Sequence, residues 1–165
     1  MGDIHIAKVK STILPVLGLI FRIKGYLRVK HLKKIYYSLI HSRLMYLAPL
    51  WGCATHCLIK PLQILQRRAI QIIFNMPIRT SSAQVYNTSQ ILPISVCIDS
   101  SSAVLVYRSL LYNLHITYLF QRRYPAYQLR TDSHLPRPQV KTSHYGLDAV
   151  VYKSITEYNN LPLDP

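Results

Sequence analysis

Residues 35–53, IYYSLIHSRLMYLAPLWGC, are apolar and aromatic except for a few polar positions that include His41 and Arg43. With the residues before them, they show apolar side chains at helical spacing, which predicts an amphipathic helix over 29–48 that Pro49 ends. The apolar face carries Leu32, Ile35, Tyr36, Leu39, Tyr46 and Leu47. The opposite, cationic face carries Lys30, Lys33, Lys34, Tyr37, Ser38 and His41. Arg43 falls on the apolar side, where it must reach water, stack on a tyrosine or contact a partner.

Apolar periodicity predicts further helices over 4–24, 58–75 and 95–115. In the first, Pro15 is expected to cause a kink and Gly25 to end the helix. Its apolar positions are Ile6, Val9, Ile13, Val16 and Ile20. The last carries Val104, Tyr107, Leu111 and Leu114 at helical spacing.

The predicted helix over 58–75 is also amphipathic, with one apolar face and one face of basic or neutral polar residues. Its apolar positions are Leu58, Leu62, Leu65, Ala69, Ile72 and Ile73. Its polar face carries Lys60, Gln63, Arg67 and Gln71, with Arg68 at the edge. A short helix near 82–88 is expected to follow, with Ser81 or Ser82 as its N-cap.

The sequence therefore predicts a mainly α fold, a bundle of about four long helices over residues 1–120. Residues 121–165 contain five prolines and few long apolar runs, which predicts an extended tail. This tail can hold one short hairpin, with AVVY at 149–152 as a β-like segment.

The charge distribution is strongly asymmetric. The chain has 20 Lys and Arg against 6 Asp and Glu, a formal net charge of +14. No acidic residue lies between Asp3 and Asp99, a span that holds thirteen Lys or Arg. Such a surface repels itself unless anions neutralise it, so we expect an anionic partner. Nucleic acid is the favoured partner, and an anionic membrane or an acidic protein surface are the alternatives.

The residues offer no catalytic, cofactor or metal site. The six acidic residues are scattered singly, so they cannot form a two-metal phosphoryl-transfer site or a glycosidase pair. The five glycines are isolated, which leaves no phosphate loop, and no Gly-x-Ser-x-Gly elbow occurs. Cys53, His56 and Cys57 lack a second ligand pair for zinc. By these counts, the chain alone is not an enzyme.

Neither secretion nor membrane insertion is expected. Three cysteines, Cys53, Cys57 and Cys97, form no disulfide framework and suit a reducing intracellular compartment. The apolar run STILPVLGLIF at 11–21 lacks a cleavage pattern and, at about eleven residues, is shorter than the roughly 20 that a spanning helix needs.

Three ordered blocks resemble the region after the polymerase core in non-LTR (LINE-type, jockey-like) retrotransposon reverse transcriptases. The first block matches at Tyr36, Leu39, Ile40, Ser42, Leu44, Tyr46, Trp51 and Gly52. The second matches at Leu62, Gln63, Gln66, Arg67, Arg68, Ala69, Ile70 and Ile73. The third, in the tail, matches at Pro138, Lys141, Thr142, Gly146, Tyr152, Tyr158, Asn159, Leu161 and Pro162.

The sequence departs from the family pattern at three positions. Leu47 stands where the family usually has glycine, Gln71 where a basic residue is common, and Tyr158 where tryptophan is usual. The palm with its catalytic carboxylates is absent from the sequence. The resemblance thus implies a carboxy-terminal piece, either a truncated copy or a reading frame left by one.

The resemblance implies a thumb-like helical region that packs on a polymerase palm and on a template-primer duplex. By charge and resemblance, the expected partner is RNA or an RNA/DNA duplex, bound without sequence preference. The expected contacts are Lys30, Lys33, Lys34, Tyr37, His41, Arg43, Lys60, Arg67 and Arg68. A nuclear location follows only by analogy with a retroelement's site of integration. Two alternatives stay open: an amphipathic helical protein bound to a membrane surface or protein partner, and a decayed reading frame with no selected role.

Overall fold

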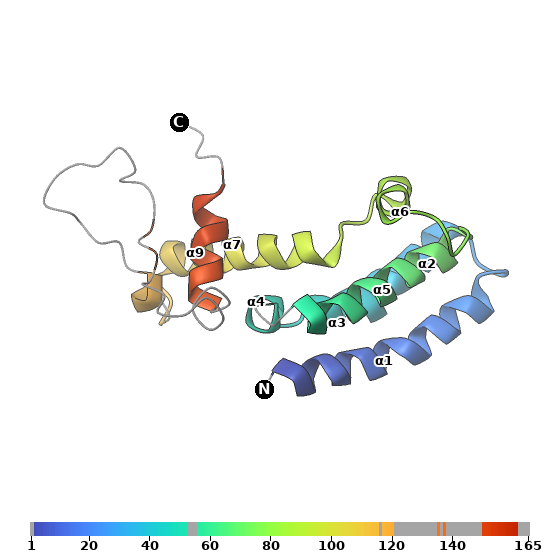
Figure 1. The fold of residues 1–165 in the computed structure, drawn as a ribbon, viewed down its shortest axis with the longest axis horizontal. Helices are drawn as coiled ribbons and strands as arrows, with labels where there is room; N and C mark the ends of the chain where they lie inside the picture. The colour runs from blue at the N-terminus through green and yellow to red at the C-terminus, as the bar shows by residue number, and fades with distance from the viewer. Residues whose placement is uncertain are drawn as a thin grey trace, which may run out of the picture. The chain divides into compact units, whose positions relative to one another are not determined.

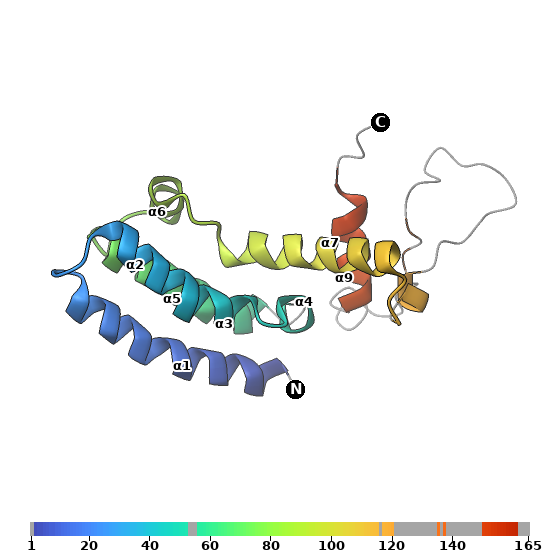
Figure 2. The same ribbon diagram turned by 180° about the vertical axis from the view of Figure 1, so that it is seen from behind.

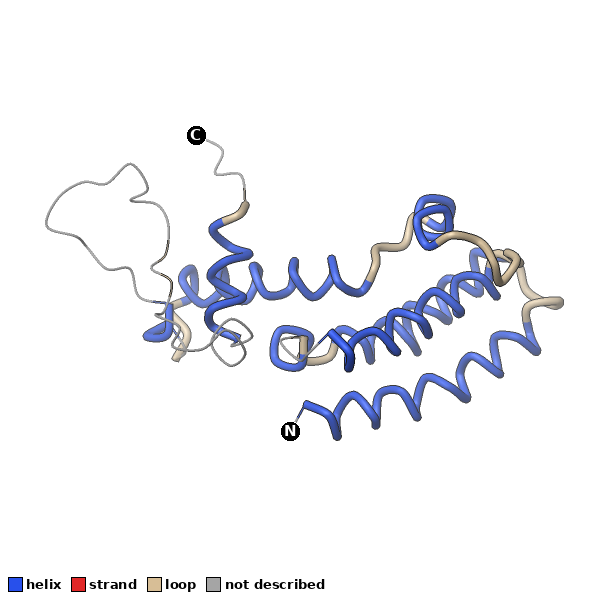
Figure 3. Tube along the Cα trace, viewed as in Figure 1, coloured by secondary structure: helices blue, strands red, loops and turns tan. Residues whose placement is uncertain are grey.

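The computed structural model describes residues 2–52, 56–115, 117–120, 135, 137 and 150–161. All regular secondary structure in these ranges is helical (Figure 3), which confirms the expected mainly α class. The chain divides into two compact units, Met1–Cys97 and Ile98–Pro165. The division falls within helix α7 (Ile94–Tyr112), ahead of the boundary expected at residue 120. A single bundle of four long helices stays a prediction.

Helix α1, Gly2–Ile23, is the first helix of the N-terminal unit and runs through Pro15 without interruption. A turn at residues 24–26 follows, so the predicted helix over 4–24 is confirmed, and Gly25 lies in that turn. One face is buried against the rest of the unit: Ile6, Val9, Ile13, Leu17 and Ile20. Leu17 thus replaces the expected Val16. In Figures 1 and 2, α1 lies side by side with α5 (His56–Ile73).

The predicted helix over 29–48 is a continuous helical stretch that ends earlier and contains a wider turn. It consists of α2 (Val29–Ile35), the π-helix η1 (Tyr36–His41) and α3 (Ser42–Met45). Its buried side chains are Leu32, Tyr36, Ile40 and Leu44. The expected apolar face is therefore wrong after Tyr36, because Leu39 is only half-buried and Tyr46 and Leu47 are exposed. A π-helix bonds residue i to i+5, so each turn takes an extra residue and the buried positions recur every four.

The expectation that Pro49 ends this helix is wrong. The helix ends at Met45, and Leu47 adopts a left-handed backbone with φ of 52°. A new short helix, α4 (Ala48–Trp51), then begins, with Pro49 in its first turn. Proline is tolerated there because the first N–H groups of a helix have no intrahelical acceptor. The indole N–H of buried Trp51 donates to the Tyr46 carbonyl oxygen at 2.8 Å, which fixes this corner.

Helices α5 (His56–Ile73) and α6 (Ser82–Ser89) form the rest of the N-terminal unit with the start of α7 (Ile94–Tyr112). The predicted N-cap is confirmed, because the Ser81 hydroxyl accepts a hydrogen bond from the Gln84 backbone N–H at 3.4 Å. The prediction that Gln71 lies on the exposed polar face is wrong, because this residue is buried. The loop after α5 folds back, and the Gln71 amide donates to the carbonyl oxygens of Pro77 and Ile78 at 3.4 and 3.2 Å.

The C-terminal unit contains most of α7, the 3₁₀ helix η2 (Thr117–Phe120) and α9 (Val150–Asn159). A small core joins them: Val106, Phe120, Leu135 and Ile155. The β-like assignment of 149–152 is wrong at Val150, Val151 and Tyr152, which lie in α9. The predicted helix over 95–115 is confirmed as α7, which ends at Tyr112. Its apolar residues at helical spacing, Val104, Tyr107 and Leu111, are exposed, as is Leu114 just beyond the helix. Most of the predicted tail, with its hairpin, lies outside the described residues.

Two helices among the described residues are long and apolar enough to cross a membrane on length and composition alone. They are Ile4–Ile23, with a mean hydropathy of 1.5, and Ile94–Tyr112, with 1.3. The argument from the run at 11–21 therefore underestimated this helix, which extends beyond the run at both ends. Core helices pass the same test, and one face of α1 is buried within its unit.

Candidate nucleic-acid interface

The basic side chains of the N-terminal unit are not neutralised by carboxylates. Lys153 and Asp99 form an ion pair at 3.1 Å, and both residues belong to the C-terminal unit. None of the described Lys and Arg side chains of the N-terminal unit makes an ion pair. The charge asymmetry of the sequence is therefore retained on the folded surface of this unit.

Lys30, Lys34, Tyr37 and the half-buried His41 form one stripe along α2 and η1. Their spacing of four, three and four residues places them on successive turns of one side of the helix. Lys30 and Lys34 are exposed, and 44 % of Tyr37 is accessible. The His41 ring meets the Tyr37 ring edge-on, with centroids 5.2 Å apart. Partial burial lowers the pKa of His41, so this ring offers neutral hydrogen-bonding groups at pH 7, not charge.

Lys33 is a packing residue as well as a cation. Its ammonium donates to the Ser89 carbonyl oxygen at 2.8 Å and lies 5.2 Å from the centre of the Phe74 ring. It therefore ties α2 to the end of α6 and to the residue that follows α5. Lys33 lies beside the stripe, with its charge half-buried.

Arg43 reaches across to α1. Its guanidinium donates to the Thr12 carbonyl oxygen at 3.2 Å. It also lines a cleft of about 300 Å³ between α1 and the end of α3, and the lining residues are His5, Lys8, Val9, Thr12, Arg43 and Tyr46. The out-of-register arginine thus makes a helix-to-helix contact while its charge remains half-buried near Lys8.

Lys60 and Arg67 lie together in a second cleft, between α5, α6 and the start of α7. This cleft, which we call the α5–α6 cleft, has a volume of about 300 Å³. Its lining residues are Lys60, Gln63, Ile64, Arg67, Ser82, Tyr86, Pro93 and Ser95. The Arg67 guanidinium donates to the Ser82 hydroxyl at 3.1 Å, which holds it at the N-terminus of α6. Ser82, Tyr86 and Ser95 were not expected here, and the only sequence signal was the capping serine pair before α6.

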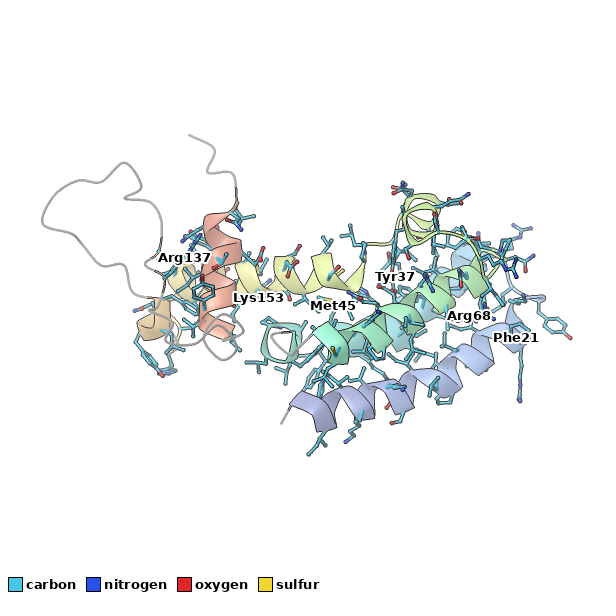
Figure 4. All side chains as sticks on the ribbon, viewed as in Figure 1. Phe21, Tyr37, Met45, Arg68, Arg137 and Lys153 are labelled. Atoms are coloured by element: carbon cyan, nitrogen blue, oxygen red, sulfur yellow. The ribbon has the colours of Figure 1, made fainter. Side chains whose placement is uncertain are left out.

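The nine predicted contacts do not form one site. Arg68 is half-buried on α5 and lines neither cleft, and Figure 4 shows it at a place separate from Tyr37. The structure brings together the stripe on α2 and η1, and separately Lys60 with Arg67. Lys33 and Arg43 serve the packing of the unit in addition to carrying charge.

A buried polar network positions these surfaces. Gln66, only 1 % exposed, donates from its amide nitrogen to the Tyr36 hydroxyl at 3.0 Å and to the Leu92 carbonyl oxygen at 2.9 Å. Its amide oxygen accepts from the Ile94 backbone N–H at 2.8 Å and from the Tyr86 hydroxyl at 3.3 Å. Burial raises the pKa of both tyrosines, so both hydroxyls stay protonated. Sequence patterning gave no sign of this network, because an isolated glutamine on a helix is normally solvated.

Cys53 and the side chain of His56 lie outside the described residues, so the expected absence of a metal site stays a prediction. No family model, curated protein or solved structure matches the chain.

Proposed function

We propose that this chain is a non-catalytic helical region that binds nucleic acid through the basic surfaces of its N-terminal unit. In this proposal it resembles the carboxy-terminal, thumb-like region of a non-LTR retrotransposon RNA-directed DNA polymerase, whose palm would be its packing partner. The observation that carries the proposal is the stripe of Lys30, Lys34, Tyr37 and His41, whose lysines are exposed, with no ion pair to any of the described cations of its unit.

The mode of binding follows from the residue types. Lysines on successive turns can neutralise successive phosphates, and such contacts carry no base information. Tyr37 offers a ring on which a base or sugar can pack, which is also tolerant of sequence. Binding should therefore be driven by charge and be indifferent to sequence.

Structural roles of three motif residues support the resemblance. Leu47 stands where the family usually has glycine, and its backbone is left-handed, the conformation that favours glycine. Gln66, from the second resembling block, is the centre of the buried network. Asn159, from the third resembling block, makes two hydrogen bonds to the backbone of Leu135. Motif residues with such structural roles are the ones a fold would retain.

The proposal is tested by the affinity of the chain for an RNA/DNA hybrid, measured by fluorescence anisotropy. The variant Lys30→Gln with Lys34→Gln removes two charges from the stripe. The control, Lys10→Gln with Arg22→Gln, removes two charges from exposed positions of α1 that are not expected contacts. We expect the stripe variant to lose about tenfold in affinity and the control far less. Equal losses would contradict the assignment of the stripe, and no binding to any nucleic acid would contradict the function.

A membrane surface is the second candidate partner. On α1 four large apolar side chains are exposed beside Lys10 and Arg22: Ile4, Leu14, Leu19 and Phe21. An amphipathic helix with this mixture can lie on a bilayer. Sedimentation with neutral phosphatidylcholine vesicles separates the two candidates, because binding there favours the membrane and indifference favours nucleic acid.

A further inference from the structure

We propose that the α5–α6 cleft binds a terminal phosphate monoester, the group found at the phosphorylated end of a nucleic acid strand and on a free nucleoside monophosphate. This inference deepens the proposed function and rests on it as far as a strand end is the ligand. It goes further in giving the cleft a task different from that of the stripe.

The cleft concentrates donors for an anion. Lys60 is exposed at its edge and makes no hydrogen bond or ion pair within the described structure, so its ammonium is available. Arg67 is half-buried, and its hydrogen bond to Ser82 orients it while leaving most of its five N–H donors unused. Gln63 and the hydroxyl of Ser95 add neutral polar groups. No carboxylate lines the cleft, so an incoming anion meets no like charge.

Two helices also begin at this cleft. Ser82 is the first residue of α6 and Ser95 the second residue of α7, and both line the cleft. Neither helix has an acidic residue in its first turn. Each helix start carries a partial positive charge from its backbone N–H groups, which adds to the two full charges of Lys60 and Arg67.

This amount of positive charge fits a monoester better than a phosphodiester. An internal phosphate of a strand carries one negative charge, whereas a terminal phosphate carries about 1.5 to 2 at pH 7. The volume, about 300 Å³, is at the lower end for ligand pockets and suits a phosphate with its sugar, not a duplex. Ile64, Pro93 and the ring of Tyr86 give apolar walls for that sugar.

The test uses single strands of one sequence with a phosphate at the 5′ end, at the 3′ end or at neither, labelled internally. Anisotropy gives the affinity of each strand for the whole chain. We expect a terminal phosphate at one end to tighten binding by about tenfold, as one charge-assisted contact would. Lys60→Gln and Arg67→Gln should each remove most of this gain, whereas the control Lys10→Gln should keep it. Lys60→Gln is the decisive variant, because the Lys60 side chain makes no contact that folding depends on.

A competition experiment distinguishes a strand end from a free nucleotide as the source of the phosphate. Displacement of the phosphorylated strand by adenosine 5′-monophosphate, but not by adenosine, supports the cleft as a site that also takes free nucleotides. Failure of the monophosphate to compete, with the gain still lost in Lys60→Gln, supports a strand end as the ligand.

The inference and the proposed function can fail separately. Equal affinity for phosphorylated and unphosphorylated strands, or a gain that survives in both cleft variants, overturns the inference and leaves the function intact. If no strand binds, the proposed function fails. Ligand-observed NMR with adenosine 5′-monophosphate then tests the cleft alone. Binding that Lys60→Gln abolishes upholds the cleft, and absence of binding overturns it.

Discussion

The side-chain amide of Gln66 donates a 3.0 Å hydrogen bond to the hydroxyl of Tyr36 in the interior of the N-terminal unit. Both side chains are almost completely buried, at 1 and 0 % exposure. The same glutamine binds the backbone of Leu92 and Ile94, so it joins η1, α5 and the start of α7. The position of both basic surfaces therefore depends on one neutral side chain.

Gln66→Leu should destabilise the N-terminal unit strongly. Leucine fills a similar volume but leaves the Ile94 N–H, the Leu92 carbonyl oxygen and the Tyr36 hydroxyl without their partner. A buried polar group left unpaired costs about 1–3 kcal/mol, so we expect a loss of about 3 kcal/mol in the free energy of unfolding, measured in urea. Gln63→Leu is the control, since Gln63 is only half-buried on the same helix. Equal effects of the two substitutions would contradict the role of the network.

Stability should fall at alkaline pH because of Tyr36. Desolvation raises the pKa of Tyr36, and the hydrogen bond from Gln66 opposes this shift only in part. At pH values above the usual phenol pKa, the folded state therefore keeps the Tyr36 proton whereas the unfolded state loses it. The contribution of Tyr36 to the free energy of unfolding is therefore complete below the usual phenol pKa of about 10. Above that pH it is lost, by at most about 1.4 kcal/mol per pH unit for one group.

Urea unfolding at about pH 8 and about pH 10.5 measures this dependence. Tyr36→Phe should weaken it, although Tyr86, whose pKa burial also raises, keeps a part. Tyr26→Phe is the control, because Tyr26 is 90 % exposed and is not part of the Gln66 network. The same pH dependence in all three proteins would show that Tyr36 ionises freely in the fold.

Leu47→Gly should stabilise the chain. The backbone of Leu47 has φ of 52°, a region that costs an L-residue about 1–2 kcal/mol and glycine almost nothing. The side chain is 49 % exposed, so little packing is lost. We expect a gain of about 0.5–1 kcal/mol in urea, reduced by the larger entropy of glycine in the unfolded chain.

The control for that substitution is Leu50→Gly. Leu50 is similarly exposed but lies in α4 with a right-handed helical backbone, where glycine costs about 1 kcal/mol. Opposite signs for the two variants are expected. A loss of stability for both would mean that the Leu47 side chain matters more than its backbone conformation.

Asn159→Ala should release Leu135 from the core of the C-terminal unit. The Asn159 side chain accepts from the Leu135 N–H at 3.0 Å and donates to the Leu135 carbonyl oxygen at 2.9 Å. Two such bonds contribute about 1–3 kcal/mol together. Hydrogen exchange at the Leu135 amide should accelerate by about tenfold or more. The control is Asn160→Ala, at an exposed neighbouring position, which should leave the Leu135 amide protected. Unchanged exchange in Asn159→Ala would contradict a role of these two hydrogen bonds in holding Leu135.

Helical periodicity predicted the class and most helix positions because buried faces of regular helices repeat at fixed spacing. It failed where the spacing changes or the sequence is apolar on more than one side. The π-helix after Ile35 moved burial to Ile40 and Leu44, which a constant period cannot anticipate. On α7, apolar residues occupy several faces, and the structure exposes Val104 and Leu111.

At two further places, tertiary contacts outweighed the preference of single residues for a strand or for the surface. Val150 and Val151 favour strands by their branched side chains, yet tertiary packing of Ile155 and Tyr158 places their segment in α9. Gln71 reads as a surface residue, but its partners are carbonyl oxygens of a loop that only the folded chain brings near.

The candidate site was predictable in charge but not in arrangement. Composition identified an unneutralised basic surface, and the spacing of Lys30, Lys34 and Tyr37 gave the stripe. The sequence could not show that the Lys33 ammonium would donate to the Ser89 carbonyl oxygen, since that contact joins segments far apart in sequence. The α5–α6 cleft also needed the fold, because Ser82 and Ser95 come from helices that meet α5 only after folding.

The salt dependence of binding to an RNA/DNA hybrid tests the central claim, that unneutralised basic helix faces of the N-terminal unit bind a polyanion. If about five phosphates are neutralised, a plot of log affinity against log salt concentration has a slope of about −4 to −5. Lys30→Gln with Lys34→Gln should make that slope shallower by about 2. A slope near zero, or one that this double variant leaves unchanged, would contradict the claim.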